Sequence, residues 1–287
     1  MNTRHPGALM PRSAALALWL PRIAPPAPPV GATSTGPAPR LGPVDDDALA
    51  QALHAVQGDD EPHTARLAAD VGDVPLADLL RSWAPRTTQV TALFPAAGDP
   101  AGVPAAVSAA AIDAEECVLV TLTAPHDAET WALVPAVTSF GSVLEPGHLV
   151  AWEAVRVPPW RSTVLAAVGD LREAERELRS GLIQATEALD RLDVARWSDS
   201  ARSVLAGLAG YRALVDLVPE DLDQRRARVL SESARLRYIV DVATADDGGA
   251  VNLWQADQRS AALRHVDHVA RRSMAAATAY DRESTES

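Results

Sequence analysis

The residues best placed to do chemistry lie near the C-terminus, where His265 and His268 stand three apart in RHVDHVARR. With Asp257 upstream they are candidates for a metal or acid–base site, because imidazole and carboxylate are ordinary zinc ligands. On a helical wheel, however, both histidines fall beside the apolar stripe centred on Val266, and Asp267 points about 200° away from His265. The stretch therefore predicts a charged outer helix face, without a metal or cofactor. The wheel places two arginines on this polar side, Arg264 and Arg271.

Two acidic loops are further candidates. The run GDDEPH (58–63) could offer oxygens to Mg²⁺ or Ca²⁺, but it lacks the spacing of an EF-hand loop, so we expect a solvated loop. The run PHDAE (125–129) could present side chains at a hairpin tip, but ordinary turn chemistry explains its composition. The polar residues of the two loops are Asp59, Asp60, Glu61 and His63, and His126, Asp127 and Glu129.

All 26 basic side chains other than histidine are arginines, and this excludes chemistry that requires lysine, such as Schiff-base formation or a P-loop. The densest basic run is Arg225, Arg226 and Arg228, which could form an interaction surface together with His265 and His268. Interleaved acids on the same predicted helix favour ion pairs within the helix. The net charge of −12 makes nucleic acid an unlikely partner.

Other recognisable chemistry is absent from the sequence. The single cysteine, Cys117, lies in the apolar run CVLVTLT and excludes an internal disulfide or a multi-cysteine metal site. No GxGxxG, Walker A, GxSxG, HExxH or CxxC motif occurs. Trp131 and Trp152 lie in predicted strands, where core packing is the first interpretation and a stacking cleft for a ligand is the alternative.

The apolar stretch SAALALWL (13–20) predicts a short amphipathic helix that docks on the body of the protein. A secretory signal with cleavage near 30–32 is the alternative, although Pro21-Arg22 ends the apolar run abruptly. Residues 21–43 are rich in proline and predict a linker. No segment has the roughly 18 apolar residues of a membrane span.

Hydrophobic periodicity then indicates the elements that must position these residues. Short helices are predicted from Asp45 through Val56, over Thr64–Ala69 and over Leu76–Trp83. Period-two runs with short, turn-rich connections favour an antiparallel sheet. The predicted strands are TQVTALF (88–94), AVSAAAI (106–112), CVLVTLT (117–123), TWALVPAVT (130–138) and HLVAWEAVRV (148–157).

Beyond Pro158-Pro159 every segment has helical periodicity. A seven-residue repeat predicts one helix over Ser162–Arg196, about 50 Å long, with possible bends at Gly169 and Gly181. A second helix is predicted from Ser198 through Leu214. Two more follow, with DDGG (246–249) between them. Four amphipathic helices with short joints favour an antiparallel bundle.

These elements predict an α+β fold, in which N-terminal helices and a small antiparallel sheet or open barrel precede an all-α helical bundle. We expect a short helix and proline-rich linker at 1–44, helices plus sheet at 45–158, and a four-helix bundle at 159–287.

Three runs, HPGALMPRSAALALW, LFPAAGDPAGVPAAVSAAAI and DDGGAVNLWQADQRSAALR, resemble a family of proteins from high-GC actinobacteria with no known activity. The resemblance extends over most of the chain. It implies a cytoplasmic bacterial protein and carries no catalytic residues over.

The functional expectation is a non-catalytic cytoplasmic interaction or scaffold protein, with a protein partner or a second copy of itself. One alternative is an enzyme or small-molecule binder whose site no motif reveals, using the Trp131/Trp152 side of the sheet or the His-bearing helix face. Another is a nucleic-acid-associated regulator that works through the arginine-rich helix.

Overall fold

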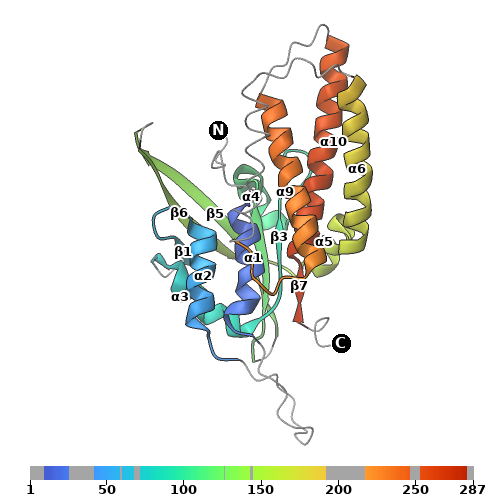
Figure 1. The fold of residues 1–287 in the computed structure, drawn as a ribbon. Coiled ribbons are helices and arrows are strands. Elements are labelled where there is room, and N and C mark those ends of the chain that lie inside the picture. Colours follow the sequence, from blue (N-terminus) through green and yellow to red (C-terminus); the bar gives the residue numbers. More distant parts are fainter. Residues whose placement is uncertain are drawn as a thin grey trace, which may run out of the picture.

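The computed structural model describes residues 10–25, 42–58, 60–67, 72–125, 127–142, 145–191, 217–245 and 253–282 (Figure 1). The fold mixes helices with a seven-stranded, mostly antiparallel sheet. The helices are α1 (Arg12–Ile23), α2 (Asp46–Gln57), α3 (Leu76–Trp83), α4 (Ser108–Ala114), α5 (Arg161–Val168), α6 (Leu171–Arg191), α9 (Gln224–Ala245) and α10 (Leu253–Thr278), with 3₁₀ turns η1 (Ala84–Arg86) and η2 (Ala105–Val107). The strands are β1 (Thr64–Leu67), β2 (Val74–Pro75), β3 (Thr87–Leu93), β4 (Cys117–Leu122), β5 (Glu129–Gly141), β6 (Pro146–Arg156) and β7 (Tyr280–Asp281).

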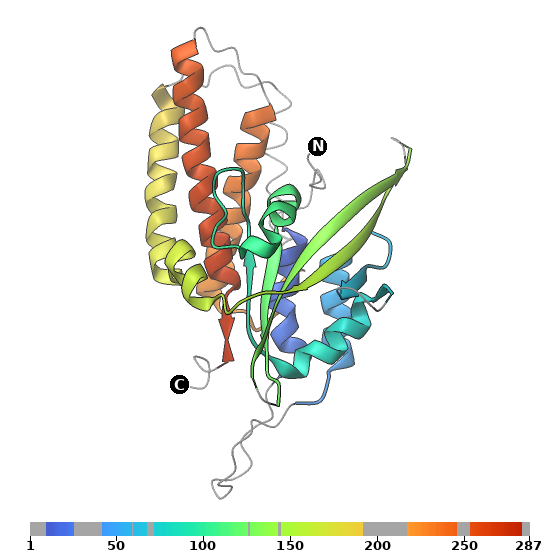
Figure 2. The same ribbon diagram turned by 180° about the vertical axis from the view of Figure 1, so that it is seen from behind.

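The sheet has the order β2-β1-β6-β5-β4-β3-β7. All neighbouring strands are antiparallel except β1 and β6, which are parallel. The ladder between β5 and β6 is long, and its outer end projects from the body as a two-stranded ribbon (Figures 1 and 2). Helices α1, α2 and α3 lie together against one face of the sheet, whereas α6, α9 and α10 stand side by side next to β3.

Helix α1 is a central part of the core. Every residue from Ser13 to Leu20 is buried, so the helix is covered around its whole circumference. It packs against α2, β3, β4 and the end of α10. Its first turn is held by Glu116, whose carboxylate accepts the N–H of Ser13 at 2.8 Å. The predicted docked helix is therefore confirmed, but its expected amphipathic character is wrong, because no side of it faces solvent. Its last carbonyl, that of Ile23, accepts the N–H of Asp45 at 2.7 Å.

The predicted helices at 45–56 and 76–83 are also confirmed, as α2 and α3. Asp45 caps α2, because its carboxylate accepts the N–H groups of Asp47 (2.9 Å) and Ala48 (3.1 Å). The predicted strands TQVTALF, CVLVTLT, TWALVPAVT and HLVAWEAVRV correspond to β3, β4, β5 and β6.

Two local predictions are wrong. AVSAAAI (106–112) is helical, in η2 and α4, because its alanines favour helix and the buried Val107 and Ala111 are spaced four apart, as on one helix face. The predicted helix over Thr64–Ala69 contains strand β1, which pairs with β6. Pairing with residues about ninety positions away outweighs the local pattern there.

The single helix predicted over Ser162–Arg196 is divided into α5 and α6. Gly169 adopts a φ of 80°, which glycine tolerates readily, and ends α5. Asp170 then begins α6, with its carboxylate accepting the N–H of Glu173 at 2.8 Å. The seven-residue apolar repeat thus extends across Gly169, although the helix is interrupted there.

Helices α6 and α9 both pack against α10. The helix predicted over 198–214 lies outside the described residues. Helix α10 ends at Thr278, whose hydroxyl accepts the N–H of Ala92 at 3.0 Å, and the chain then enters β7. Tyr280, which follows α10, pairs with Val90 as part of the sheet. The C-terminal helices are therefore joined to the edge of the sheet.

Leu20 tests the role of α1, because its side chain is fully buried. We expect Leu20→Ala to lower the free energy of unfolding by about 2–5 kcal/mol through lost apolar burial and the cavity that remains. Urea denaturation would measure the loss. As a control, Ile183→Ala on α6 removes a side chain that is 61% exposed and should change stability by less than about 0.5 kcal/mol. Equal effects of both substitutions would contradict a core role for α1.

Candidate functional site

The two histidines that stand together in the sequence have different surroundings. His265 is exposed, whereas the Nδ1 atom of His268 lies 2.8 Å from the carboxylate of Asp99. Asp99 belongs to the turn that follows β3, far away in the sequence. Asp267 points elsewhere and accepts the Nε–H of Arg271 at 2.7 Å. The structure thus places a carboxylate beside His268 that the sequence did not indicate.

The prediction of a solvated Arg271 is wrong. Only 6% of its side chain is exposed, and its guanidinium donates to the carbonyl of Phe94 at 2.8 Å and lies 3.0 Å from Asp99. The loop after β3 folds over α10 and supplies these acceptors. Within the described residues no three His, Cys, Asp or Glu are grouped to hold a metal ion. Asp257 falls in α10, where its side chain lies outside the described part of the structure.

The loop 58–63 is solvated only in part, because Gly58, Glu61 and Pro62 are exposed whereas two other side chains point inward. The side chains of Asp60 and His63 are 2% and 0% exposed. The carboxylate of Asp60 accepts the Nε–H of Arg12 from α1 at 2.9 Å and lies 3.3 Å from ring nitrogens of both His63 and His148. Asp59 lies outside the described residues. The network connects the start of α1, the loop and strand β6.

The hydrogen bonds determine which ring nitrogen of His63 carries the proton. The indole N–H of Trp152 can only donate, and it donates to Nδ1 of His63 at 3.2 Å. Nε2 therefore carries the proton and donates to Asp60. Burial lowers the pKa of His63 from 6.5 to about 4, although Asp60 acts in the opposite direction. Burial alone would raise the pKa of Asp60, but Arg12 and His63 outweigh it and lower that pKa.

An imidazole held on a carboxylate is the arrangement that acid–base catalysts use. Here the side chains of Asp60 and His63 are closed to solvent, and both ring nitrogens of His63 are in use. A substrate has no approach to either nitrogen. The network is therefore a buried polar connection that fixes the position of α1, and its chemistry is confined to its effect on stability.

The three arginines of the run on α9 have different surroundings. The guanidinium of Arg225 contacts the carboxylate of Glu175 on α6, and Arg226 donates to the carbonyls of Ala277 (3.2 Å) and Ala279 (2.5 Å) after the last turns of α10. Arg228 is exposed. The side chains of Arg225 and Arg226 thus contact other elements, and the expectation of pairing within the helix does not describe them.

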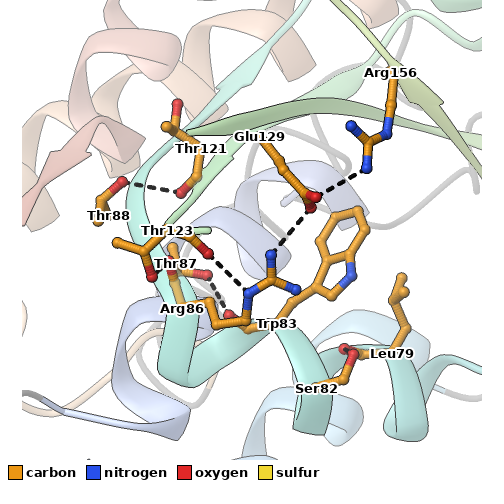
Figure 3. Close-up of polar contacts among 10 residues, drawn as sticks. All are labelled: Leu79, Ser82, Trp83, Arg86, Thr87, Thr88, Thr121, Thr123, Glu129 and Arg156. Carbon is orange, nitrogen blue, oxygen red and sulfur yellow. Dashed lines mark hydrogen bonds and ion pairs between the residues drawn. The ribbon is translucent and has the colours of Figure 1, made fainter. Parts of the chain in front are cut away.

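Glu129, from the second acidic loop, begins β5 and lies between two arginines (Figure 3). It accepts from Arg86 at 3.0 Å and from Arg156 at 2.9 Å. Arg86 also donates to the carbonyl of Thr123 at 2.9 Å. Burial alone would raise the pKa of Glu129, but the two arginines lower it. The group holds the end of the β4–β5 hairpin on η1. His126 lies outside the described residues.

Both strand tryptophans belong to the core. The register of β5 and β6 places Trp131 and Trp152 on the same face of the sheet, as predicted. Trp131 lies 5.5 Å from the ring of Trp83 and beneath the guanidinium of Arg156, and Trp152 is fully buried beside His63. Their aromatic faces are covered by the protein itself, so the ligand-stacking alternative does not apply to them.

The space that could take a ligand lies elsewhere, at the junction of the sheet with the C-terminal helices. A cavity of about 960 Å³ opens between α1, α5, β3, β7 and the segment before α9. Its apolar wall comes from Ala17, Leu18, Val90, Trp160, Val164, Leu165, Val168, Leu171, Leu222, Ala275, Ala276 and Tyr280. The volume is within the range of sites for organic ligands, roughly 300–1,000 Å³.

Arginines enter this cavity from several elements. Arg22 on α1 pairs with Asp221 at 2.5 Å, and Arg161 on α5 pairs with Asp281 of β7. Arg282 follows β7 and is 5% exposed. No sequence motif indicates this site, because its residues come from positions 17 to 282. The one local signal was Trp160, an aromatic residue placed directly after Pro158-Pro159 at the start of a helix.

Comparison with protein families gives two adjacent matches. Residues 44–168 match the N-terminal domain of the Rv1486c-like proteins, and residues 172–275 match their C-terminal domain. The chain belongs to the Rv1486c-like family. The two matched regions meet at Gly169–Leu171, where α5 ends and α6 begins. Comparison with curated proteins and with solved structures finds no match. Among the described helices of this Rv1486c-like chain, none combines the length and apolar character needed to cross a membrane.

The buried histidine predicts how the stability of this Rv1486c-like protein depends on pH. Folded His63 has a pKa of about 4, below its ordinary 6.5, so the unfolded chain binds a proton that the folded chain does not. The contribution of His63 to the free energy of unfolding is therefore complete above pH 6.5 and falls as the pH decreases toward 4. At pH 5 the free energy of unfolding should be about 2 kcal/mol lower for this reason. Urea denaturation at pH 7 and pH 5 would measure it.

The matched variant is His63→Gln, which keeps a polar side chain but cannot be protonated. Its free energy of unfolding should change less than that of the wild type between pH 7 and pH 5. Identical changes in both proteins would show that another group controls this part of the profile.

Proposed function

We propose that this protein is a non-catalytic binding protein, whose ligand is a small molecule with an apolar body that occupies the cavity beside α1. The observation that carries the proposal is the cavity of about 960 Å³, lined largely by aliphatic and aromatic side chains, at the junction of the sheet and the C-terminal helices. Junctions between structural units are a frequent place for such sites.

The lining supports binding without covalent chemistry. The described lining residues include no His, Cys or Ser. The hydroxyl of Thr278 donates to the carbonyl of Ala275 and accepts the N–H of Ala92, and the hydroxyl of Thr91 lies within 3.4 Å of carbonyl oxygens. Neither threonine has a base beside it that would make it a nucleophile.

Binding of the ligand would also affect the binding of a partner protein, which is the function expected from the sequence. The wall before α9 contacts α1 through the indole N–H of Trp19, which donates to the carbonyl of Leu217 at 2.9 Å. A ligand between α1, α5 and α9 would stabilise one arrangement of the C-terminal helices against the sheet. We further propose that α6, α9 and α10 form a four-helix bundle with the helix predicted over 198–214, and that the protein acts in the cytoplasm of a high-GC actinobacterium.

A neutral fluorescent probe, N-phenyl-1-naphthylamine, tests the proposal. We expect saturable binding of one probe per chain, seen as increased fluorescence. Leu165 lies at the mouth of the cavity, 57% exposed, so Leu165→Trp should obstruct it without disturbing the core and weaken probe binding about tenfold.

The control is Ile183→Trp, which places the same side chain at an equally exposed helical position away from the cavity. Its affinity for the probe should equal that of the wild type. Absence of saturable binding, or equal affinity in the Leu165→Trp variant, would contradict a ligand site in this cavity.

A further inference from the structure

Two buried hydrogen-bond donors without an acceptor belong to residues that line the cavity. The Nε–H of Arg282 and the indole N–H of Trp160 each lack a hydrogen-bond partner, and both residues are only 5% exposed. Of the buried side-chain atoms without a partner in the described part of the chain, only these two belong to residues that line the cavity. Both are donors, so the missing group is an acceptor.

The two chain segments that carry the donors are joined by an ion pair. Trp160 precedes Arg161 at the start of α5, and Arg282 follows Asp281 at the end of β7. The guanidinium of Arg161 pairs with the carboxylate of Asp281, so this pair joins the two chain segments that carry the donors. Helix α5 has no acidic residue in its first turn, and the positive end of its dipole adds to the same field.

The carboxylates that line the cavity either have partners already or are exposed. Asp281 pairs with Arg161 and also accepts from the amide of Gln89 at 3.3 Å. Asp221 pairs with Arg22. The remaining acids are two helix caps, Asp170 and Asp223, and the exposed Glu220. The described structure therefore gives Arg282 no counter-charge, unlike Arg22 and Arg161.

A buried arginine without a counter-charge is costly, because its guanidinium loses water without gaining an acceptor. An anion in the cavity would remove this cost. Carboxylate and phosphate both present oxygens in the geometry that guanidinium binds best, and the indole N–H offers one more donor. The aliphatic wall formed by α1, α5 and α10 requires that the rest of the ligand be apolar.

We propose that the cavity is a site for an amphipathic anion, a molecule with a carboxylate or phosphate head bound by Arg282 and Trp160 and an apolar chain lying against α1 and α5. The inference rests on the proposed function and specifies the class of its ligand. Arg226 and Arg161 also line this cavity.

Three probes of equal chain length test the head group: decanoate, decyl phosphate and decan-1-ol, each measured by its displacement of N-phenyl-1-naphthylamine. We expect one or both anions to displace the probe at concentrations roughly ten- to a hundredfold lower than decanol, as for hydrogen bonds to a charged group. The anion that binds more tightly identifies the head as carboxylate or phosphate.

The variant Arg282→Met keeps the apolar stem and removes the charge. It should reduce the preference for the anions to less than about threefold while the affinity for decanol is retained. The ligand-free variant should unfold at an equal or higher temperature than the wild type, because an uncompensated buried charge has been removed. A merely structural arginine would instead give a lower unfolding temperature.

The matched control is Arg237→Met, because Arg237 is equally buried but lies over the ring of Phe94, outside the cavity. It should keep the wild-type preference for anions. Equal affinities of the wild type for decanol and both anions would overturn this inference and leave the proposed function intact. Failure of all three probes and of N-phenyl-1-naphthylamine would overturn both. A preference that persists in Arg282→Met would overturn the role of Arg282.

Discussion

The burial of α1 is the constraint on which the rest of the structure depends. A helix that is apolar around its circumference has to be covered on every side, and here the cover comes from α2, the sheet and α10. These elements are separated in the sequence by more than two hundred residues. The two arginines at the ends of α1 also have partners from other elements, because Arg12 binds Asp60 and Arg22 binds Asp221. The helix thereby fixes the buried histidine network at one end and the cavity at the other.

Several arginines of this protein connect helices and turns that are separate in the sequence. Arg225 joins α9 to α6, and Arg271 joins α10 to the turn after β3. The long side chain and planar guanidinium of arginine allow it to span packed elements while its stem stays in apolar surroundings. With no lysine in the chain, every such connection keeps its charge across the physiological pH range. Arg282 is as buried as Arg271, but its Nε–H has no acceptor in the described part of the chain.

Local pattern was sufficient to predict some elements and misleading for others. Helices α2 and α3 and strands β3 to β6 follow from capping residues and from two- or four-residue periodicity, because those signals act within a few residues. Strand β1 depends on pairing with β6, and the alanine-rich α4 has too few distinctive residues for its period to be read. The heptad pattern continued through Gly169, so the break between α5 and α6 was visible only as a possible bend. The wheel placed His265 and His268 together beside the apolar stripe, but it could not show the partner of His268, which comes from a distant turn. The cavity could not be predicted, because its walls are assembled from elements at both ends of the chain.

Strand β7 has a consequence for how the protein is made. During synthesis the edge of β3 stays uncovered until Tyr280 and Asp281 have been added, since these residues pair with Gln89 and Val90. An open strand edge can pair with another chain, and contacts between distant residues slow folding. Nascent chains that carry only the N-terminal half would therefore be prone to associate through β3. In a chain truncated before Tyr280, the edge of β3 would stay exposed in the finished protein and not only during synthesis.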